Sequence, residues 1–339
     1  NRKRSIASFK INVGYMAEDQ VQNAVERAFS SDFVFRSPRR DEDGKEVTDV
    51  LVLFGDVGLV IQSKAEALGP KGKKERTSLD WAKKNLSKAS RQLGGAIRML
   101  RSGRVSSIEN SRRGTVPFRR EEVPYLYGLA VLHHESIPYV PVDVAPVLRE
   151  IESPVHVLSF RDFVNLTHFL DTPADFIGYL ENRSIVLMPT LNPQVHREQD
   201  TFRYWLNNLE GVNETAAKTK GMNFSAQDFK AYAEQQRLIV TGKHPDLRYG
   251  KLLDDIIDKA HESDPSLGPV EINGKIIPKS DPQDYINIAS ELGKIPRARR
   301  ALLGRRFLKI AELAGSTNST RHVLTYNNQR SDCLLFIAN

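Results

Sequence analysis

A predicted β-hairpin at residues 46–64 constrains the fold of this chain more than any other stretch. Two apolar segments flank a turn at residues 55–58 that contains two glycines, and this pattern is typical of antiparallel strands joined by a short turn. Side chains alternate between the two faces of a strand, so Gln62 and Lys64 are expected on the same face. The hairpin returns Asp49 to a position beside them.

Three polar side chains therefore gather at neighbouring strand ends, where packing gives no reason for them. The carboxylate of Asp49 and the amide oxygen of Gln62 suit a hard cation such as Mg²⁺. The ammonium group of Lys64 can orient or deprotonate a water molecule and stabilise a developing negative charge. The alternative is an ordinary exposed hairpin with polar strand ends, and only the surrounding sequence can separate the two interpretations.

The composition fits a folded protein with one large domain or two. The chain has 339 residues, of which 40% are hydrophobic, enough to fill a core. No apolar run approaches the roughly 20 residues of a membrane span, and no signal peptide opens the sequence, so no membrane association is expected. The chain begins at Asn1 without a methionine and ends in a strand-like segment, which suggests a fragment of a longer protein.

The cysteine and histidine content limits the other kinds of site. A single cysteine, Cys333, excludes an internal disulfide framework and a cysteine zinc cage, and it fits a reducing cytoplasm. The eight histidines are scattered without a zinc-protease spacing, and we interpret them as structural or surface residues.

The order of the predicted elements favours an α/β domain with a mixed central sheet flanked by helices. Apolar periodicity predicts helices at residues 13–30, 79–102, 160–169 and 174–180, and strands at 33–35, 50–54, 59–64, 125–132 and 155–158. Residues 185–188 are either an edge strand or the start of a linker.

From about residue 192 onward the sequence is mostly helical, so we place the first domain at residues 1–188 and the second at 189–339. Helices are predicted at residues 201–209, 226–238, 249–260, 284–292 and 296–313, a hairpin at 270–277, and two strands at 321–326 and 333–338. This second domain carries no catalytic spacing. Its expected roles are substrate binding, oligomerisation or regulation.

The net formal charge of +7 favours an anionic partner, and the basic residues concentrate between residues 71 and 120. A solvated helix face usually mixes both signs, whereas the helix predicted at 79–102 is mostly basic outside its apolar face. We expect it to bind a phosphate backbone through Lys83, Lys84, Lys88, Arg91 and Arg98. Neighbouring basic residues are Lys71, Lys73, Lys74, Arg104, Arg112, Arg113, Arg119 and Arg120.

The order of elements in the hairpin resembles the core of the PD-(D/E)xK nucleases, in the variant where glutamine replaces the acidic residue. This order is Asp49, an apolar strand, a glycine turn, a second strand and Gln62-x-Lys64. The closest likeness is to Mrr-type restriction endonucleases and the nuclease-related domain family. Those families open with a helix bearing a G-x-x-x-E-x-x-V-like pattern, and Gly14, Glu18 and Val21 stand in that place. The likeness covers roughly residues 13–92 and implies a restriction-endonuclease-like fold.

The resemblance also implies a role for each matching residue. Asp49 would bind Mg²⁺ directly, with Mn²⁺ as a substitute, Gln62 would offer its carbonyl oxygen, and the backbone carbonyl of Ser63 would add a ligand. Lys64 would position the attacking water and stabilise the charge of the phosphorane. Glu18 would be the helix carboxylate that completes the metal site.

The glutamine is the departure from the family pattern. It removes one negative charge, which should weaken divalent-metal affinity unless Glu18 compensates. Glu26, two turns further along the same helix, is the reserve candidate for the helix carboxylate. Gln92, on the helix that follows the hairpin, is expected to contact the site or the nucleic acid.

The sequence thus predicts a Mg²⁺-dependent nuclease that hydrolyses phosphodiester bonds of DNA, in a restriction or anti-phage defence system. Expected partners are DNA and either further copies of the chain or a partner protein of such a system. The alternative is a catalytically inactive nuclease-fold module for nucleic-acid binding or complex assembly, which Gln62 would permit. RNA is a third candidate substrate, since phosphate contacts do not distinguish it from DNA.

Overall fold

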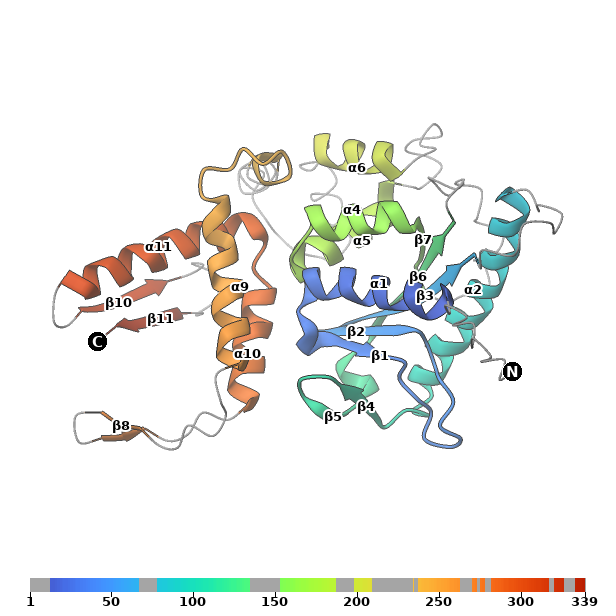
Figure 1. Cartoon of the computed structure of the whole chain (residues 1–339), viewed down its shortest axis with the longest axis horizontal. Helices are drawn as coiled ribbons and strands as arrows, with labels where there is room; N and C mark the ends of the chain where they lie inside the picture. Colours follow the sequence, from blue (N-terminus) through green and yellow to red (C-terminus); the bar gives the residue numbers. More distant parts are fainter. Residues whose placement is uncertain are drawn as a thin grey trace, which may run out of the picture. The chain divides into compact units, whose positions relative to one another are not determined.

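The computed structural model describes residues 13–66, 78–134, 153–186, 198–208, 234, 237–262, 270–272, 275–277, 282–316, 320–325 and 333–338. The chain divides into two compact units, residues 1–223 and 224–339, which are described separately (Figure 1). This division falls later in the chain than residue 188, where the sequence suggests the end of the first domain.

The first unit is built on a five-stranded mixed sheet in the order β1-β2-β3-β6-β7. The strands are β1 (Val34–Arg36), β2 (Val50–Phe54), β3 (Val57–Ala65), β6 (Tyr125–His133) and β7 (Val155–Ser159). The first three strands pair antiparallel, whereas β3, β6 and β7 pair parallel. The α/β class, the mixed sheet and the β2–β3 hairpin are therefore confirmed, and β3 is the central strand.

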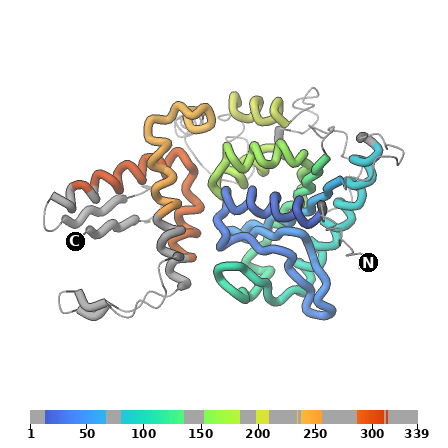
Figure 2. The backbone as a smooth tube through the Cα atoms, viewed as in Figure 1, coloured from blue at the N-terminus to red at the C-terminus, as the bar shows by residue number. Residues whose placement is uncertain are grey.

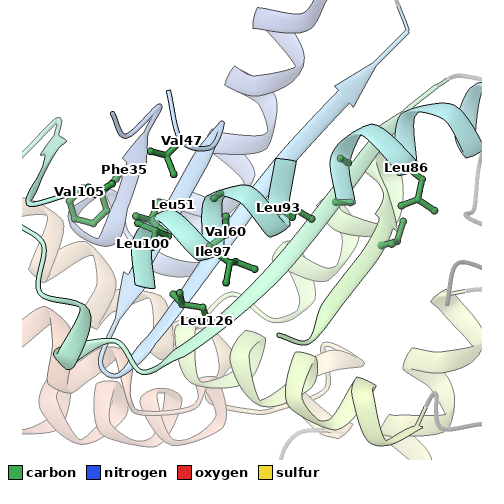
Figure 3. Packing of buried hydrophobic residues seen from close by; sticks show 14 of the residues in the cluster. Phe35, Val47, Leu51, Val60, Leu86, Leu93, Ile97, Leu100, Val105 and Leu126 are labelled. Carbon is green, nitrogen blue, oxygen red and sulfur yellow. The ribbon is translucent and has the colours of Figure 1, made fainter. Parts of the chain in front are cut away.

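Helix α2 (Ser78–Arg101) covers one face of the sheet, where it contacts β3 and β6. Its buried side chains, among them Leu93 and Ile97, pack on Leu51, Val60 and Leu126 (Figure 3). Leu93, Ile97 and Leu51 are at most 2% exposed. The even-numbered residues of β3 near Val60 thus belong to the face that α2 covers.

Helices α1 (Val13–Phe29), α4 (Phe160–Phe169) and α5 (Pro173–Val186) cover the opposite face. The ring of Phe29 in α1 contacts Phe54 of β2 and Phe176 of α5 edge to face. Helix α6 (Glu198–Asn207) packs against α5. The path of the chain through the two helical layers and the sheet can be followed in Figure 2.

Two local features differ from the sequence expectations. Residues 185 and 186 belong to α5 rather than to an edge strand, while residues 187 and 188 lie outside the described part. A short antiparallel hairpin, β4 (Ser107–Asn110) with β5 (Gly114–Pro117), was not predicted. The side-chain amide of Asn110 donates to the backbone carbonyls of Ser31 and Val34, at 2.8 and 2.9 Å, and ties this hairpin to the sheet edge.

The second unit contains α9 (Leu247–Glu262), α10 (Pro282–Gly293) and α11 (Arg297–Ser316), with α9 packed along α11. It also contains two short antiparallel pairs, β8 (Val270–Ile272) with β9 (Lys275–Ile277) and β10 (Thr320–Thr325) with β11 (Cys333–Ala338). The mostly helical character and these strands are as predicted. Most of the helix predicted at 226–238 lies outside the described residues.

Helices α9 and α11 approach each other closely through glycine. A Cβ atom added at Gly304 would lie 1.9 Å from the carbonyl oxygen of Tyr249, so only glycine permits this contact. Arg297 and Arg300 of α11 are buried and pair with Asp254 of α9. Part of the basic character of α11 is therefore internal to the unit.

No helix among the described residues is both long and apolar enough to cross a lipid bilayer.

Candidate active site

The β2–β3 hairpin brings the predicted catalytic residues together. Val50 pairs with Ile61, so Asp49 lies at the end of β2 next to the segment that carries Gln62, Ser63 and Lys64. Oδ2 of Asp49 accepts a hydrogen bond from the backbone amide of Ser63 at 2.6 Å. Asp49 is 6% exposed, and the hydrogen bond from a strand amide fixes its carboxylate.

Lys64 occupies the centre of the cluster. Its Nζ donates to the Gln62 side-chain oxygen at 3.1 Å and to the Ser63 carbonyl at 2.7 Å, and it lies 3.9 Å from Oδ2 of Asp49. Burial lowers the pKa of Lys64, as does the nearby positive charge of Lys88, while the charge of Asp49 opposes the change. The ammonium group of Lys64 is thus partly desolvated, and the negative charge of Asp49 is the interaction that most favours its protonated form.

The side-chain amide of Gln62 is held at both ends. Its Nε2 donates to the hydroxyl of Thr48 at 3.2 Å, and that hydroxyl donates to the backbone carbonyl of Ile61 at 2.7 Å. Gln62 is 2% exposed. Because Nε2 is committed to Thr48, the carbonyl oxygen is the end that faces Lys64, and its second lone pair is open to a further partner.

Glu18 of α1 belongs to the same cluster. Its pKa is raised by partial burial and by the charge of Asp49, and it is lowered in part by the charges of Arg36 and Lys64. Glu18 is therefore close enough to interact with both catalytic candidates on the hairpin. Glu26, the reserve candidate, instead accepts a hydrogen bond from Gln22 of its own helix at 2.8 Å.

Glu46 is a site residue that sequence reasoning missed. It forms an isolated antiparallel bridge with Arg39, which brings it to the base of a small turn beside Asp49. Glu46 lies at the solvent-exposed rim, where partial burial of its carboxyl group raises its pKa, followed by the charges of Asp49 and Glu18. The sequence Asp41-Glu-Asp-Gly44 is typical of a turn, and Gly44 has φ of +64°. This turn was the sequence feature that could have placed Glu46 near Asp49.

The donor set fits a divalent cation that keeps part of its water shell. No group of three or more His, Cys, Asp or Glu side chains in the described ranges is arranged to hold a metal ion. Mg²⁺, however, is commonly bound through one or two carboxylates with several waters retained. Asp49 and Glu18, the Gln62 side-chain oxygen and the Ser63 carbonyl are oxygen donors of this kind. The Ser63 hydroxyl is buried without a hydrogen-bond partner, a further polar group that a bound water could satisfy.

The predicted phosphate-binding residues of α2 are exposed to solvent. Lys84, Arg91 and Arg98 follow one another at intervals of seven residues, close to two helical turns, so they form a row about 21 Å long. Within the described ranges, none of the five predicted basic residues of α2 has an ion-pair partner. Lys88 lies beside this row and is the member whose charge reaches Lys64. Gln92 is exposed, and no hydrogen bond joins it to the site residues described above.

The described basic residues that follow α2 are mostly paired with groups of the chain itself. Arg112 pairs with the buried carboxylate of Asp32 at 3.4 Å, and Arg119 and Arg120 pair with the acidic residues that follow them. Arg113 donates to the backbone carbonyl of Asp32 at 3.3 Å. Lys71, Lys73 and Lys74 lie outside the described residues. Among the described residues of this part of the chain, the positive charge without an ion-pair partner is therefore concentrated on α2.

Comparisons with known proteins identify no relative. No family model matches the chain, and no curated protein or solved structure is significantly similar to it.

Proposed function

We propose that the chain is a Mg²⁺-dependent nuclease that hydrolyses phosphodiester bonds of DNA. The observation that carries this proposal is the contact of Lys64 with Gln62, Ser63 and Asp49 at the end of the central hairpin. A half-buried ammonium group beside a fixed carboxylate and two oxygen acceptors has no packing purpose, and such perturbed groups are typical of active sites. The order of helix, strand, hairpin and basic helix supports a restriction-endonuclease-like first unit.

Each residue contributes a separate part of the chemistry. A bound cation would supply charge neutralisation at the phosphate. Asp49, with Glu18, Gln62 and the Ser63 carbonyl, would hold that cation. Lys64 would orient the attacking water and stabilise the negative charge that develops on the phosphoryl oxygens, an effect that is strong in a site with little solvent.

A nucleic acid is the proposed substrate because the exposed row on α2 lies next to the site through Lys88, and DNA is preferred to RNA because of the resemblance to restriction endonucleases. Unpaired lysine and arginine side chains along a helix match the regular negative charge of a phosphate backbone. A role in a restriction or anti-phage system is inferred from the resemblance to Mrr-type enzymes alone. In such a system the second unit would serve substrate binding, oligomerisation or regulation.

The decisive experiment incubates the purified protein with plasmid, linear duplex DNA, single-stranded DNA and RNA, each with and without Mg²⁺ or Mn²⁺. We expect cleavage that requires the cation and is lost in Asp49→Ala and Lys64→Ala. The matched control is Asp56→Asn, because Asp56 is exposed in the turn at the other end of the same hairpin. Cleavage that survives both alanine variants, or that is lost equally in the control, would refute the assignment.

The second candidate function is a catalytically inactive module that binds nucleic acid or assembles a complex. The observation in its favour is Gln62, whose amide is already hydrogen-bonded at both ends. A calorimetric titration with Mn²⁺ separates the candidates, since the catalytic site requires binding that depends on Asp49 and the inactive module requires only DNA binding.

A further inference from the structure

Ser63 is the residue at which the hairpin, the lysine and the carboxylate meet. Its backbone amide donates to Asp49 at 2.6 Å, and its backbone carbonyl accepts from Lys64 at 2.7 Å. Its hydroxyl is the one polar group of the residue that has no partner within the described part of the chain. The residue is 7% exposed, so bulk solvent does not satisfy the hydroxyl.

An unsatisfied buried hydroxyl destabilises a fold. An apolar residue at position 63 would avoid this destabilisation, because the preceding residues on the same face of β3 are Leu59 and Ile61, which are at most 1% exposed. An alanine at position 63 would continue that apolar face without loss. The serine therefore points to a partner that is not part of the protein.

The direction of the side chain indicates where that partner lies. Gln62 and Lys64 share the face of Val60, which α2 covers, so Ser63 is on the opposite face by strand alternation. That opposite face is covered by α1, the helix that carries Glu18. Ser63 thus presents its hydroxyl toward the helix whose carboxylate interacts with Asp49.

We propose that the Ser63 hydroxyl hydrogen-bonds a water molecule in the coordination shell of the divalent cation, on the α1 side of the site. This inference rests on the proposed function. Mg²⁺ retains several waters, and groups that bind such outer positions typically change metal affinity by about 10- to 100-fold. Ser63 is in this role a positioning residue, since it acts on the reaction through the water it holds. It also adds a neutral contact to a site in which Gln62 supplies no charge.

Metal affinity and stability respond in different directions to Ser63→Ala, and this makes the test specific. Without metal, removal of an unsatisfied hydroxyl leaves the melting temperature unchanged or raises it. With Mn²⁺ titrated in a calorimeter, we expect the affinity to fall about 10- to 100-fold. Ser63→Thr keeps a hydroxyl and is expected to bind Mn²⁺ more tightly than the alanine variant.

Ser90→Ala is the matched control. Ser90 lies in α2, is 4% exposed, and also has a buried hydroxyl without a partner, but a helical serine can turn to the carbonyl of the preceding turn. We expect this variant to keep the Mn²⁺ affinity of the parent protein.

The outcomes separate the inference from the proposed function. If Ser63→Ala binds Mn²⁺ like the parent protein while Asp49→Ala does not bind, the inference is wrong and the proposed function stands. A melting temperature of the metal-free Ser63→Ala protein well below the parent value would show a structural role and also overturn it. If the parent protein binds no Mn²⁺, or Asp49→Ala binds it equally well, the proposed metal site itself fails.

Discussion

Replacing Glu198 by alanine should destabilise the first unit strongly, because it removes the partner of a buried arginine. Nε of Arg183 lies 3.0 Å from both carboxylate oxygens of Glu198, and Nη2 lies 2.7 Å from one of them. Tyr179, which is fully buried, also donates to Glu198. Arg183 and Glu198 are 8% and 9% exposed, so little solvent reaches either charge.

The magnitude follows from what remains around Arg183 in the variant. Among the described residues its remaining hydrogen-bonding partners are the Val157 carbonyl and Nδ1 of His156, both at 3.3 Å, and Tyr179. None of these groups carries a negative charge, and Asp162 is the remaining carboxylate whose charge reaches Arg183. Breaking a buried pair by removing one partner costs about 3–5 kcal/mol. Removing both charges in Arg183→Met with Glu198→Ala should cost much less, because no uncompensated charge is left.

Tryptophan fluorescence during urea unfolding measures this effect in the first unit alone. The chain has two tryptophans, Trp81 in α2 and Trp205 in α6, and both belong to that unit. The ring of Trp205 lies 5.1 Å from the ring of Tyr179, so it reports directly on the network. A loss below about 1 kcal/mol in Glu198→Ala, as for exposed pairs, would refute the interpretation of a buried ion pair.

Three further perturbations test other parts of the structure. Gly304→Ala should lower the unfolding temperature of the second unit, because the new Cβ would overlap a backbone carbonyl. Gly178→Ala has open space for its Cβ and should stabilise α5 by about 0.5–1 kcal/mol. Calorimetry would show both effects, and an unchanged unfolding temperature of the second unit in Gly304→Ala would contradict the close helix contact. Burial and a neighbouring arginine hold the pKa of His156 well below 6.5. The folded state therefore binds fewer protons than the unfolded state, and stability should fall as the pH drops below about 6.5. In urea titrations His156→Gln should lose this part of the pH dependence, and a pH profile identical to that of the parent protein would exclude the effect. Arg91→Gln should weaken DNA binding and reduce the slope of log affinity against log salt by about 0.9 for one lost duplex contact, while Arg119→Gln, whose guanidinium is paired, should change neither quantity in a filter-binding assay.

Most of the architecture of the first unit could be predicted because its elements have regular apolar periods. Helix α1, the β2–β3 hairpin and helix α2 follow directly from such patterns. The β4–β5 hairpin was missed because its strands are short and half-exposed, and because Arg112 and Arg113 suggested a nucleic-acid surface. Their actual partner is Asp32, which is distant in sequence, and local patterns do not reveal such contacts.

The candidate site was partly predictable for the same reason. Strand alternation alone places Gln62 and Lys64 together, and the hairpin adds Asp49. The choice of Glu18 over Glu26 came from the family-like pattern of Gly14, Glu18 and Val21, because periodicity alone does not separate two carboxylates that lie two turns apart on one helix. Glu46 needed the path of an irregular turn, and the orphaned hydroxyl of Ser63 became visible only when the hydrogen bonds around it could be counted.

The position of β3 at the centre of the sheet has a consequence for how the site can behave. Both edges of this strand are engaged, by β2 on one side and β6 on the other, and the register with β6 extends through Lys64 and Ala65. Backbone amides in such a strand exchange with solvent deuterium only when a large part of the unit opens. The candidate catalytic groups therefore lie on a strand that is hydrogen-bonded on both edges, and control of the proposed site would have to come from access and charge rather than from movement of the strand.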